Sequence, residues 1–150
     1  MHLRVVRLLT ALLLSTGLGC LSDPMGWRRG LRDSQLSYTQ SMRWGNLQKA
    51  SAFVEPELRE AFLESADEFA NIRITDYDIG AMQYESSNRA TVKVTYRAYA
   101  LGTYLDRVIR ETQQWRRAGF SGQWWVQPTI QNLVAGIERP ALRPSSRPAL

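Results

Sequence analysis

The fold of this chain is decided by the stretch Ala90-Thr91-Val92-Lys93-Val94-Thr95-Tyr96-Arg97-Ala98-Tyr99-Ala100. Small and apolar residues alternate with polar residues along it, and a period of two is typical of a β-strand with one buried face. We therefore expect a half-buried antiparallel strand over 90–100, with one face made of Ala90, Val92, Val94, Tyr96, Ala98 and Ala100.

Three further strands are predicted around this one. Residues 72–84 have strand-like content, with an interruption near Gly80, and a polar turn follows at 86–88. On the other side, a tight turn at Gly102-Thr103 leads into a strand over 104–117, and a second turn leads into 123–127. The sequence thus predicts a four-stranded antiparallel meander.

Helices are predicted ahead of the sheet. A helix capped by Asp33 or Ser34 runs to Trp44, where Gly45 supplies a left-handed stop and Asn46 a new cap. A short helix follows over 47–54. A third begins at Glu55-Pro56 and reaches Ala70, with an apolar stripe of Leu58, Ala61, Phe62, Ala66 and Phe69. The predicted fold class is α+β, with N-terminal helices packed on a curved four-stranded antiparallel sheet.

The first 19 residues have the pattern of an export signal. Arg4 and Arg7 precede an apolar stretch that is shorter than the roughly 20 residues needed to cross a bilayer. Cys20 follows directly and is the single cysteine of the chain, so an internal disulfide is excluded.

We expect Trp27 to pack on the domain, with a place among lipid headgroups as the alternative. The predicted organisation is a signal peptide over 1–19, a lipidated Cys20 with a short tether over 20–33, the α+β domain over 34–130, and a C-terminal segment over 131–150 that ends in a disordered Arg-Pro tail.

Composition excludes several function classes. Five of the 19 basic residues lie in the leader and the tail, which leaves 14 basic against 14 acidic residues and no basic footprint for nucleic acid. His2 is the only histidine and leaves with the leader, so histidine-dependent catalysis and histidine-bearing zinc sites are excluded from the mature chain. Because glycine-rich phosphate loops are missing as well, no cofactor and no metal are predicted.

Several motifs resemble a known family. The segment Thr16-Gly17-Leu18-Gly19-Cys20 is similar to a lipobox, although Gly17 and Leu18 depart from its usual pattern. Tyr38, Met42, Trp44-Gly45-Asn46, Phe53-Val54 and Gln123-Trp124-Trp125 resemble small bacterial envelope lipoproteins with a nuclear-transport-factor-two-like, cystatin-like cone domain. The resemblance implies helices on a strongly curved sheet that enclose a pocket. It also implies fatty acyl chains on Cys20 and, because Leu21 follows, a place on the periplasmic face of the outer membrane.

Pairing the strands across Gly102-Thr103 predicts which polar residues lie on the same face of the sheet as Val92 and Val94. Ala100 then faces Leu105, and the following pairs bring polar side chains of the second strand onto that face. A polar group on an apolar concave surface is a candidate for a pocket lining; the alternatives are an exposed sheet end, or a one-residue bulge that exchanges the two faces. The candidate pocket residues are Tyr96, Arg107, Glu111, Gln113 and Trp115.

Trp124 and Trp125 are neighbours on the last predicted strand, so their side chains point to opposite faces. The outward one is a candidate contact for a partner protein, since aromatic side chains anchor interfaces. The alternative is that both belong to the core.

These observations predict a non-catalytic periplasmic lipoprotein without catalytic residues. It is anchored to the outer membrane by its N-terminal lipid, and it docks an envelope protein partner or holds a small hydrophobic ligand. One alternative is a small pocket enzyme of isomerase or hydrolase type, in which Glu111 transfers a proton and Arg107 or Gln113 steadies negative charge. The other is a structural subunit of a homo-oligomer.

Overall fold

The structure is a computed structural model that describes residues 26–103, 105–119 and 122–138. The predicted signal peptide, the lipid site at Cys20 and the Arg-Pro tail lie outside these described residues. No described helix is long and apolar enough to cross a membrane.

A four-stranded antiparallel sheet forms one layer, in the order β1-β2-β3-β4. Its strands are β1 (Ile72–Ser86), β2 (Arg89–Ala100), β3 (Arg107–Arg117) and β4 (Trp124–Gln127). The predicted register between β2 and β3 is confirmed, from Ala98 opposite Arg107 to Ala90 opposite Trp115. The predicted pair of Ala100 and Leu105 is not formed, because β3 begins only at Arg107.

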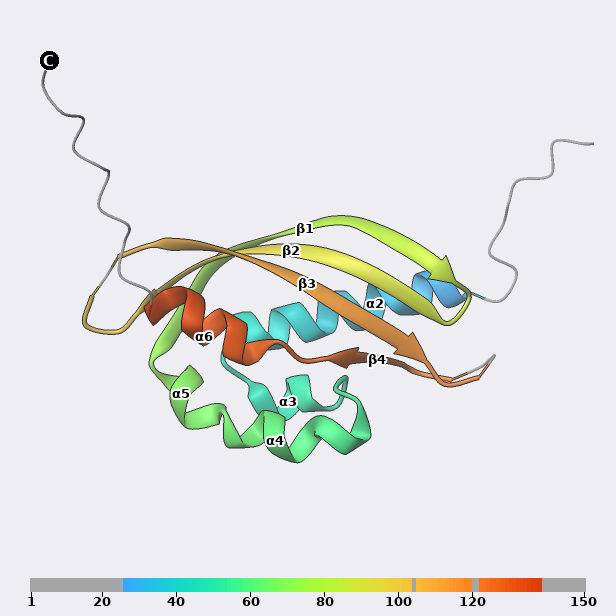
Figure 1. The fold of residues 1–150 in the computed structure, drawn as a ribbon, viewed down its shortest axis with the longest axis horizontal. Coiled ribbons are helices and arrows are strands. Elements are labelled where there is room, and N and C mark those ends of the chain that lie inside the picture. Colours follow the sequence, from blue (N-terminus) through green and yellow to red (C-terminus); the bar gives the residue numbers. More distant parts are fainter. Residues whose placement is uncertain (1–25, 104, 120–121, 139–150) are drawn as a thin grey trace, which may run out of the picture.

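The helices lie under the concave side of this sheet, which arches over them (Figure 1). They are α2 (Trp27–Arg43), α3 (Leu47–Ser51), the 3-10 turn η1 (Pro56–Leu58), α4 (Arg59–Glu64), α5 (Ala66–Ala70) and α6 (Ile130–Glu138). The predicted α+β cone is therefore the observed fold.

Gly45 and Asn46 separate α2 from α3 as predicted. Gly45 has a φ of 68°, and its N–H donates to the carbonyl oxygen of Met42. The side-chain oxygen of Asn46 accepts a hydrogen bond from the backbone N–H of Lys49 at 2.9 Å, which satisfies a donor at the start of α3. Together these two residues turn the chain back under the sheet.

The first helix begins earlier than predicted, at Trp27, so residues 27–33 are helical rather than a tether. Tertiary contacts account for this difference. Trp27 packs on the core with its ring centroid 6.4 Å from that of Trp124, and Leu31 is fully buried. The prediction that Trp27 packs on the domain is confirmed.

The predicted third helix is broken at Ser65 into α4 and α5. The hydroxyl of Ser65 is part-buried and donates to the carbonyl oxygen of Ala61 at 3.3 Å. A serine that bonds the preceding turn in this way competes with the regular helical pattern, and the chain bends there.

Helix α6 was not predicted: no helix or strand was assigned to the segment 131–150, of which only the Arg-Pro tail was expected to be disordered. Its buried residues recur at spacings of three and four, which is the pattern of an amphipathic helix. A Cβ on Gly136 would lie 3.2 Å from side-chain carbons of Ile109, so glycine lets α6 approach β3 closely. The buried residues of α6 are Ile130, Leu133, Val134 and Ile137.

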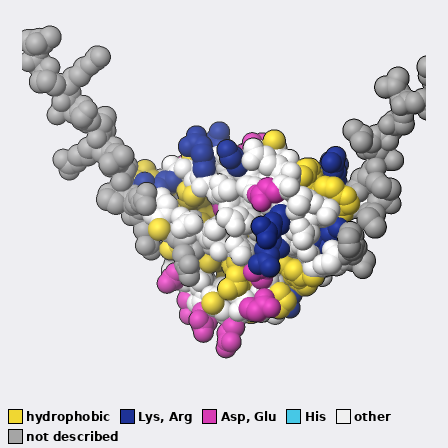
Figure 2. All heavy atoms as spheres, turned by 45° about the vertical axis from the view of Figure 1, so that its right-hand side comes forward, with side chains coloured by type: hydrophobic (Ala, Val, Ile, Leu, Met, Phe, Trp, Pro, Cys, Tyr) yellow, Lys and Arg dark blue, Asp and Glu magenta, His cyan; other side chains and the backbone are white. Residues whose placement is uncertain are grey.

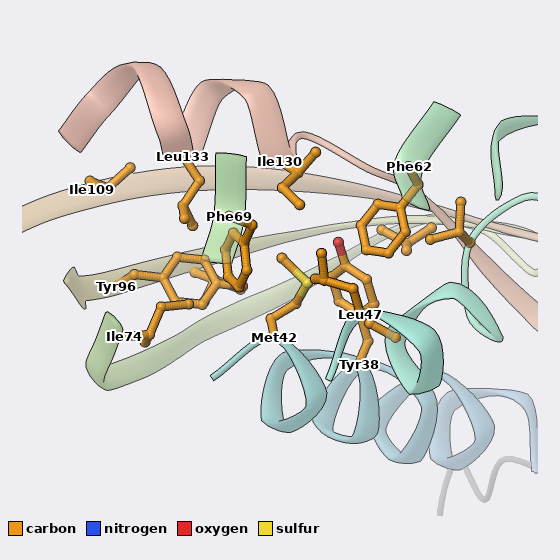
Figure 3. Packing of buried hydrophobic residues seen from close by; sticks show 14 of the residues in the cluster. Tyr38, Met42, Leu47, Phe62, Phe69, Ile74, Tyr96, Ile109, Ile130 and Leu133 are labelled. Atoms are coloured by element: carbon orange, nitrogen blue, oxygen red, sulfur yellow. The ribbon is translucent and has the colours of Figure 1, made fainter. Parts of the chain in front are cut away.

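The core fills the space between the sheet and the helices. Figure 3 shows Tyr38 and Met42 from α2 beside Phe62 and Phe69, with Ile130 and Leu133 of α6 on the opposite side. Figure 2 shows acidic side chains gathered at the bottom of the view and basic ones both at the top and in the middle of the same face. Residues 57–68 carry the exposed acidic residues Glu57, Glu60, Glu64, Asp67 and Glu68, whereas α2 carries the exposed Arg28, Arg29 and Arg32, and the sheet carries exposed residues of both signs.

Truncation of Leu133 tests whether α6 belongs to the folded core. We expect Leu133→Ala to lower the free energy of unfolding by about 2–5 kcal/mol, because it leaves a cavity among buried side chains. Urea denaturation followed by tryptophan fluorescence measures the change. Val108→Ala, at a site that is 56% exposed, is the control and changes the free energy by less than about 0.5 kcal/mol. Equal effects of the two variants would show that α6 does not pack as described.

Candidate functional site

A cluster of polar side chains lies inside the cone, at the middle of β3. Glu111 is 8% exposed and Gln113 is fully buried. Because a buried carboxylate loses its hydration, it persists only where hydrogen bonds replace the lost water.

Gln113 is the centre of this cluster. Its amide Nε2 donates to Glu111 Oε2 at 2.8 Å and to the Tyr96 hydroxyl at 3.2 Å. Its Oε1 accepts from the indole Nε1 of Trp115 at 3.2 Å and from Gln35 Nε2 of α2 at 3.4 Å. Both hydrogens of the Gln113 amide are thus in use within the protein.

Thr129 completes the surroundings of the carboxylate. Its hydroxyl donates a hydrogen bond to Glu111 Oε1. Thr129 directly precedes α6, so this hydrogen bond ties the C-terminal helix to β3. Sequence reasoning missed Thr129, since nothing in the local pattern indicates what a residue beyond the last strand will meet.

Two tyrosines of the cluster are fully buried, Tyr38 from α2 and Tyr96 from β2. Burial raises the pKa of each phenol well above 10.0, and the negative charge of Glu111 raises it further. Both phenols therefore keep their protons at neutral pH. Among the described residues, neither the Tyr38 hydroxyl nor Gln35 Oε1 has a hydrogen-bond partner.

The contribution of α2 was missed by the sequence reasoning. Gln35, Tyr38 and Thr39 are buried on the same face of the helix, and Gln35 Nε2 donates to Thr39 Oγ1 at 3.0 Å. Their spacing of three and four residues could have indicated that α2 contributes to a polar site, because polar residues on the buried face of a helix need hydrogen-bond partners.

The structure brings together four of the five predicted pocket residues, namely Tyr96, Glu111, Gln113 and Trp115. Arg107 is separate from them, since it is only half-buried and lies at the beginning of β3.

The two neighbouring tryptophans do point to opposite faces. Trp124 is buried and its Nε1 donates to the carbonyl oxygen of Trp27 at 2.9 Å, so it belongs to the core. Trp125 is half-buried, with the guanidinium carbon of Arg59 4.9 Å from its ring centroid. Of the two candidate partner contacts, only Trp125 is partly exposed and so accessible to a partner protein.

A hollow of about 1020 Å³ lies at one end of the cone, between the α2–α3 turn, the helices α4 and α5 and the start of β1. Leu47, Phe69 and Ile74 line it and belong to the same core as the two tyrosines. Glu111 is not part of its lining. In Figure 3, Met42 lies between Tyr38 and Phe69, and Phe69 lines the hollow.

Within the part of the chain that the structure describes, no group of three or more histidine, cysteine, aspartate or glutamate side chains is placed to hold a metal ion.

Comparison with known proteins returned solved structures only. No protein-family model matches the chain, and no curated protein sequence matches it. A ketosteroid isomerase-like protein from Erwinia carotovora atroseptica is 14% identical with a TM-score of 0.49, covering 65% of this chain and 88% of that one. A candidate polyketide cyclase from Xanthomonas campestris is 11% identical with a TM-score of 0.49, covering 75% and 99%. A candidate scytalone dehydratase from Novosphingobium aromaticivorans is 12% identical with a TM-score of 0.48, covering 67% and 78%. At these identities the likeness concerns the fold.

The main functional prediction from the sequence is corrected at this point. It described a non-catalytic docking or ligand-binding lipoprotein, whereas the solved structures of similar fold carry the names of an isomerase-like protein, cyclases and a dehydratase. The nuclear-transport-factor-two-like part of the resemblance agrees with the fold, and the lipoprotein part stays a prediction.

The pKa shifts of the two buried phenols predict a loss of stability in alkali. Above pH 10 the tyrosines of the unfolded chain ionise while Tyr38 and Tyr96 in the folded chain keep their protons. The free energy of unfolding therefore falls as the pH rises, by about 1.4 kcal/mol per pH unit for each phenol. Urea denaturation at pH 8 and pH 11 measures this, and Tyr38→Phe reduces the fall. A fall of equal size in both proteins would contradict the assignment.

Proposed function

We propose that the chain is a small pocket enzyme of isomerase type, which moves a proton within a small apolar carbonyl compound. One observation carries this proposal. A buried carboxylate, Glu111, lies in the cone together with two protonated phenols, and the hydroxyl of Tyr38 has no partner among the described residues. A base and an unpartnered hydrogen-bond donor within one desolvated core are the two groups that enolisation requires.

Glu111 acts as the base. Its carboxylate takes a proton from the carbon next to the carbonyl; the electron pair of the broken C–H bond forms a C=C bond, and negative charge moves to the carbonyl oxygen. In a substrate with a C=C bond between the β and γ carbons the enolate is conjugated, so return of the proton from Glu111 to the γ carbon moves the double bond next to the carbonyl and gives the isomer without another reactant. Gln113 and Thr129 each donate a hydrogen bond to one oxygen of Glu111, and these two hydrogen bonds fix the orientation of the carboxylate.

Tyr38 supplies the donor for the developing negative charge. Gln113 was a sequence-based candidate for this role, but both hydrogens of its amide are used by Tyr96 and Glu111. Arg107, the other candidate, lies at the beginning of β3 away from the cluster. The raised pKa of the Tyr38 phenol keeps its proton in place at neutral pH.

Substrate reaches the cluster from the hollow at the end of the cone. Met42 is 2% exposed and lies between Phe69, which lines the hollow, and Tyr38, as Figure 3 shows. An unbranched thioether side chain changes rotamer easily, so displacement of Met42 opens this route without moving a helix.

The enzyme is further proposed to be anchored on the periplasmic face of the outer membrane through lipid on Cys20. The support is the leader sequence, with its basic start, short apolar core and lipobox-like end.

Hydrogen exchange tests the proposed chemistry without knowledge of the natural substrate. We expect the protein to catalyse exchange of α-hydrogens for deuterium in some members of a panel of apolar cyclic ketones, as followed by NMR in heavy water. Glu111→Gln keeps the shape of the side chain and lowers the catalysed rate by about 100-fold or more. Tyr38→Phe lowers it by about 100-fold as well.

Asp106→Asn, at an exposed position before β3, serves as the matched control and retains the rate. The proposal fails if no ketone exchanges faster than it does without protein. It also fails if Glu111→Gln is as active as the original chain.

The anchor is tested by metabolic labelling with a radioactive fatty acid in a bacterial host. We expect label in the protein with Cys20 and none in Cys20→Ser, because the thiol is the attachment point. Labelling of both proteins, or of neither, would show that Cys20 carries no lipid.

A further inference from the structure

The hollow at the end of the cone has an unusual balance of charge. Its lining contains two arginines, Arg43 and Arg73, and no acidic residue. The remaining surface is largely apolar and includes Leu63, Phe69 and Ile72. A site that joins an apolar floor to a positive rim is complementary to a molecule with an apolar body and a negative group.

Both arginines are held by backbone carbonyls and not by carboxylates. Arg43 Nη2 donates to the carbonyl oxygen of Thr75 at 3.0 Å, and Arg73 Nη1 donates to the carbonyl oxygens of Ala70 and Ile72 at 2.9 Å. Among the described residues, neither arginine forms an ion pair. Their positions are therefore fixed while their charge and several N–H donors stay available.

Trp44 stands at the rim of the same hollow and is 78% exposed. The guanidinium carbon of Arg43 lies 5.4 Å from the ring centroid of Trp44 and 5.8 Å from that of Tyr77. Such contacts with two rings orient the guanidinium further. The exposed indole offers an apolar face that a bound molecule would cover.

We infer that the hollow selects a carboxylate-bearing amphiphile as substrate, with Arg43 and Arg73 pairing with the carboxylate at the rim. The apolar body lies along Leu47, Phe69 and Ile74, which leads it towards Tyr38 and Glu111. A volume of about 1020 Å³ accommodates a molecule of this kind. This inference names the substrate class of the proposed enzyme and rests on that function for its catalytic part.

Binding of decanoate, 1-decanol and decyltrimethylammonium tests the selection by charge, with all three kept below their aggregation limits. Isothermal titration calorimetry gives the dissociation constants. We expect decanoate to bind at least about tenfold more tightly than 1-decanol, since hydrogen bonds between charged groups add to the shared apolar contact. Of the three probes, the cation decyltrimethylammonium is expected to bind most weakly.

The double variant Arg43→Gln/Arg73→Gln separates the charge effect from the shape of the hollow. It should bind decanoate and 1-decanol equally, with affinity for 1-decanol retained. Arg110→Gln, on the exposed face of β3, is the matched control and keeps the preference. Equal affinity of the original chain for the three probes, no binding of any, or an intact preference in the double variant would each overturn the inference.

Decanoate binding and deuterium exchange, both measured on the original chain, distinguish this inference from the proposed function. If decanoate binds selectively but no ketone exchanges its hydrogens, the enzymatic proposal falls and the charge-selective site stands. If ketones exchange but the arginine variants alter neither binding nor the KM of a carboxylate-bearing ketone, the inference falls alone.

Discussion

The hydrogen bonds that hold the Glu111 carboxylate inside the cone are the constraint on which the rest of the structure depends. A carboxylate at this depth requires donors on both oxygens, and Gln113 and Thr129 provide them. Gln113 in turn requires Tyr96 on β2 and Gln35 on α2 as partners. One buried charge thus joins β2, β3, the helix α2 and the residue directly ahead of α6.

Closure of the cone by α6 follows from the same arrangement. Thr129 bonds Glu111 directly ahead of α6, and the apolar face of that helix covers the inner side of β3 and β2. The close approach at Gly136 makes this cover tight. The hollow at the α2–α3 turn is lined in part by Leu47, Phe69 and Ile74, which belong to the same core as the two tyrosines.

The charges of the proposed site are arranged in sequence from the surface to the interior. Arg43 and Arg73 line the hollow without carboxylate partners, Leu47 and Phe69 line it as members of the core, and the phenols of Tyr38 and Tyr96 are buried in that same core. A substrate with a negative end is attracted to the rim and repelled by Glu111, so its orientation is set before it reaches the base. Low exposure around Glu111 and Tyr38 strengthens each electrostatic contact, because little water is present to screen it.

The strand pattern by itself determined the meander and the pairing of β2 with β3, because alternation and a tight turn leave one register that buries a single face. For that reason Tyr96, Glu111, Gln113 and Trp115 were placed on one surface from sequence. Only the tertiary structure decided that Tyr38 and Gln35 meet them from α2, that Thr129 bonds the carboxylate, and that residues 130–138 form a helix. Periodicity reports which face of a segment is apolar, whereas the partner of that face is chosen by packing between residues far apart in the chain.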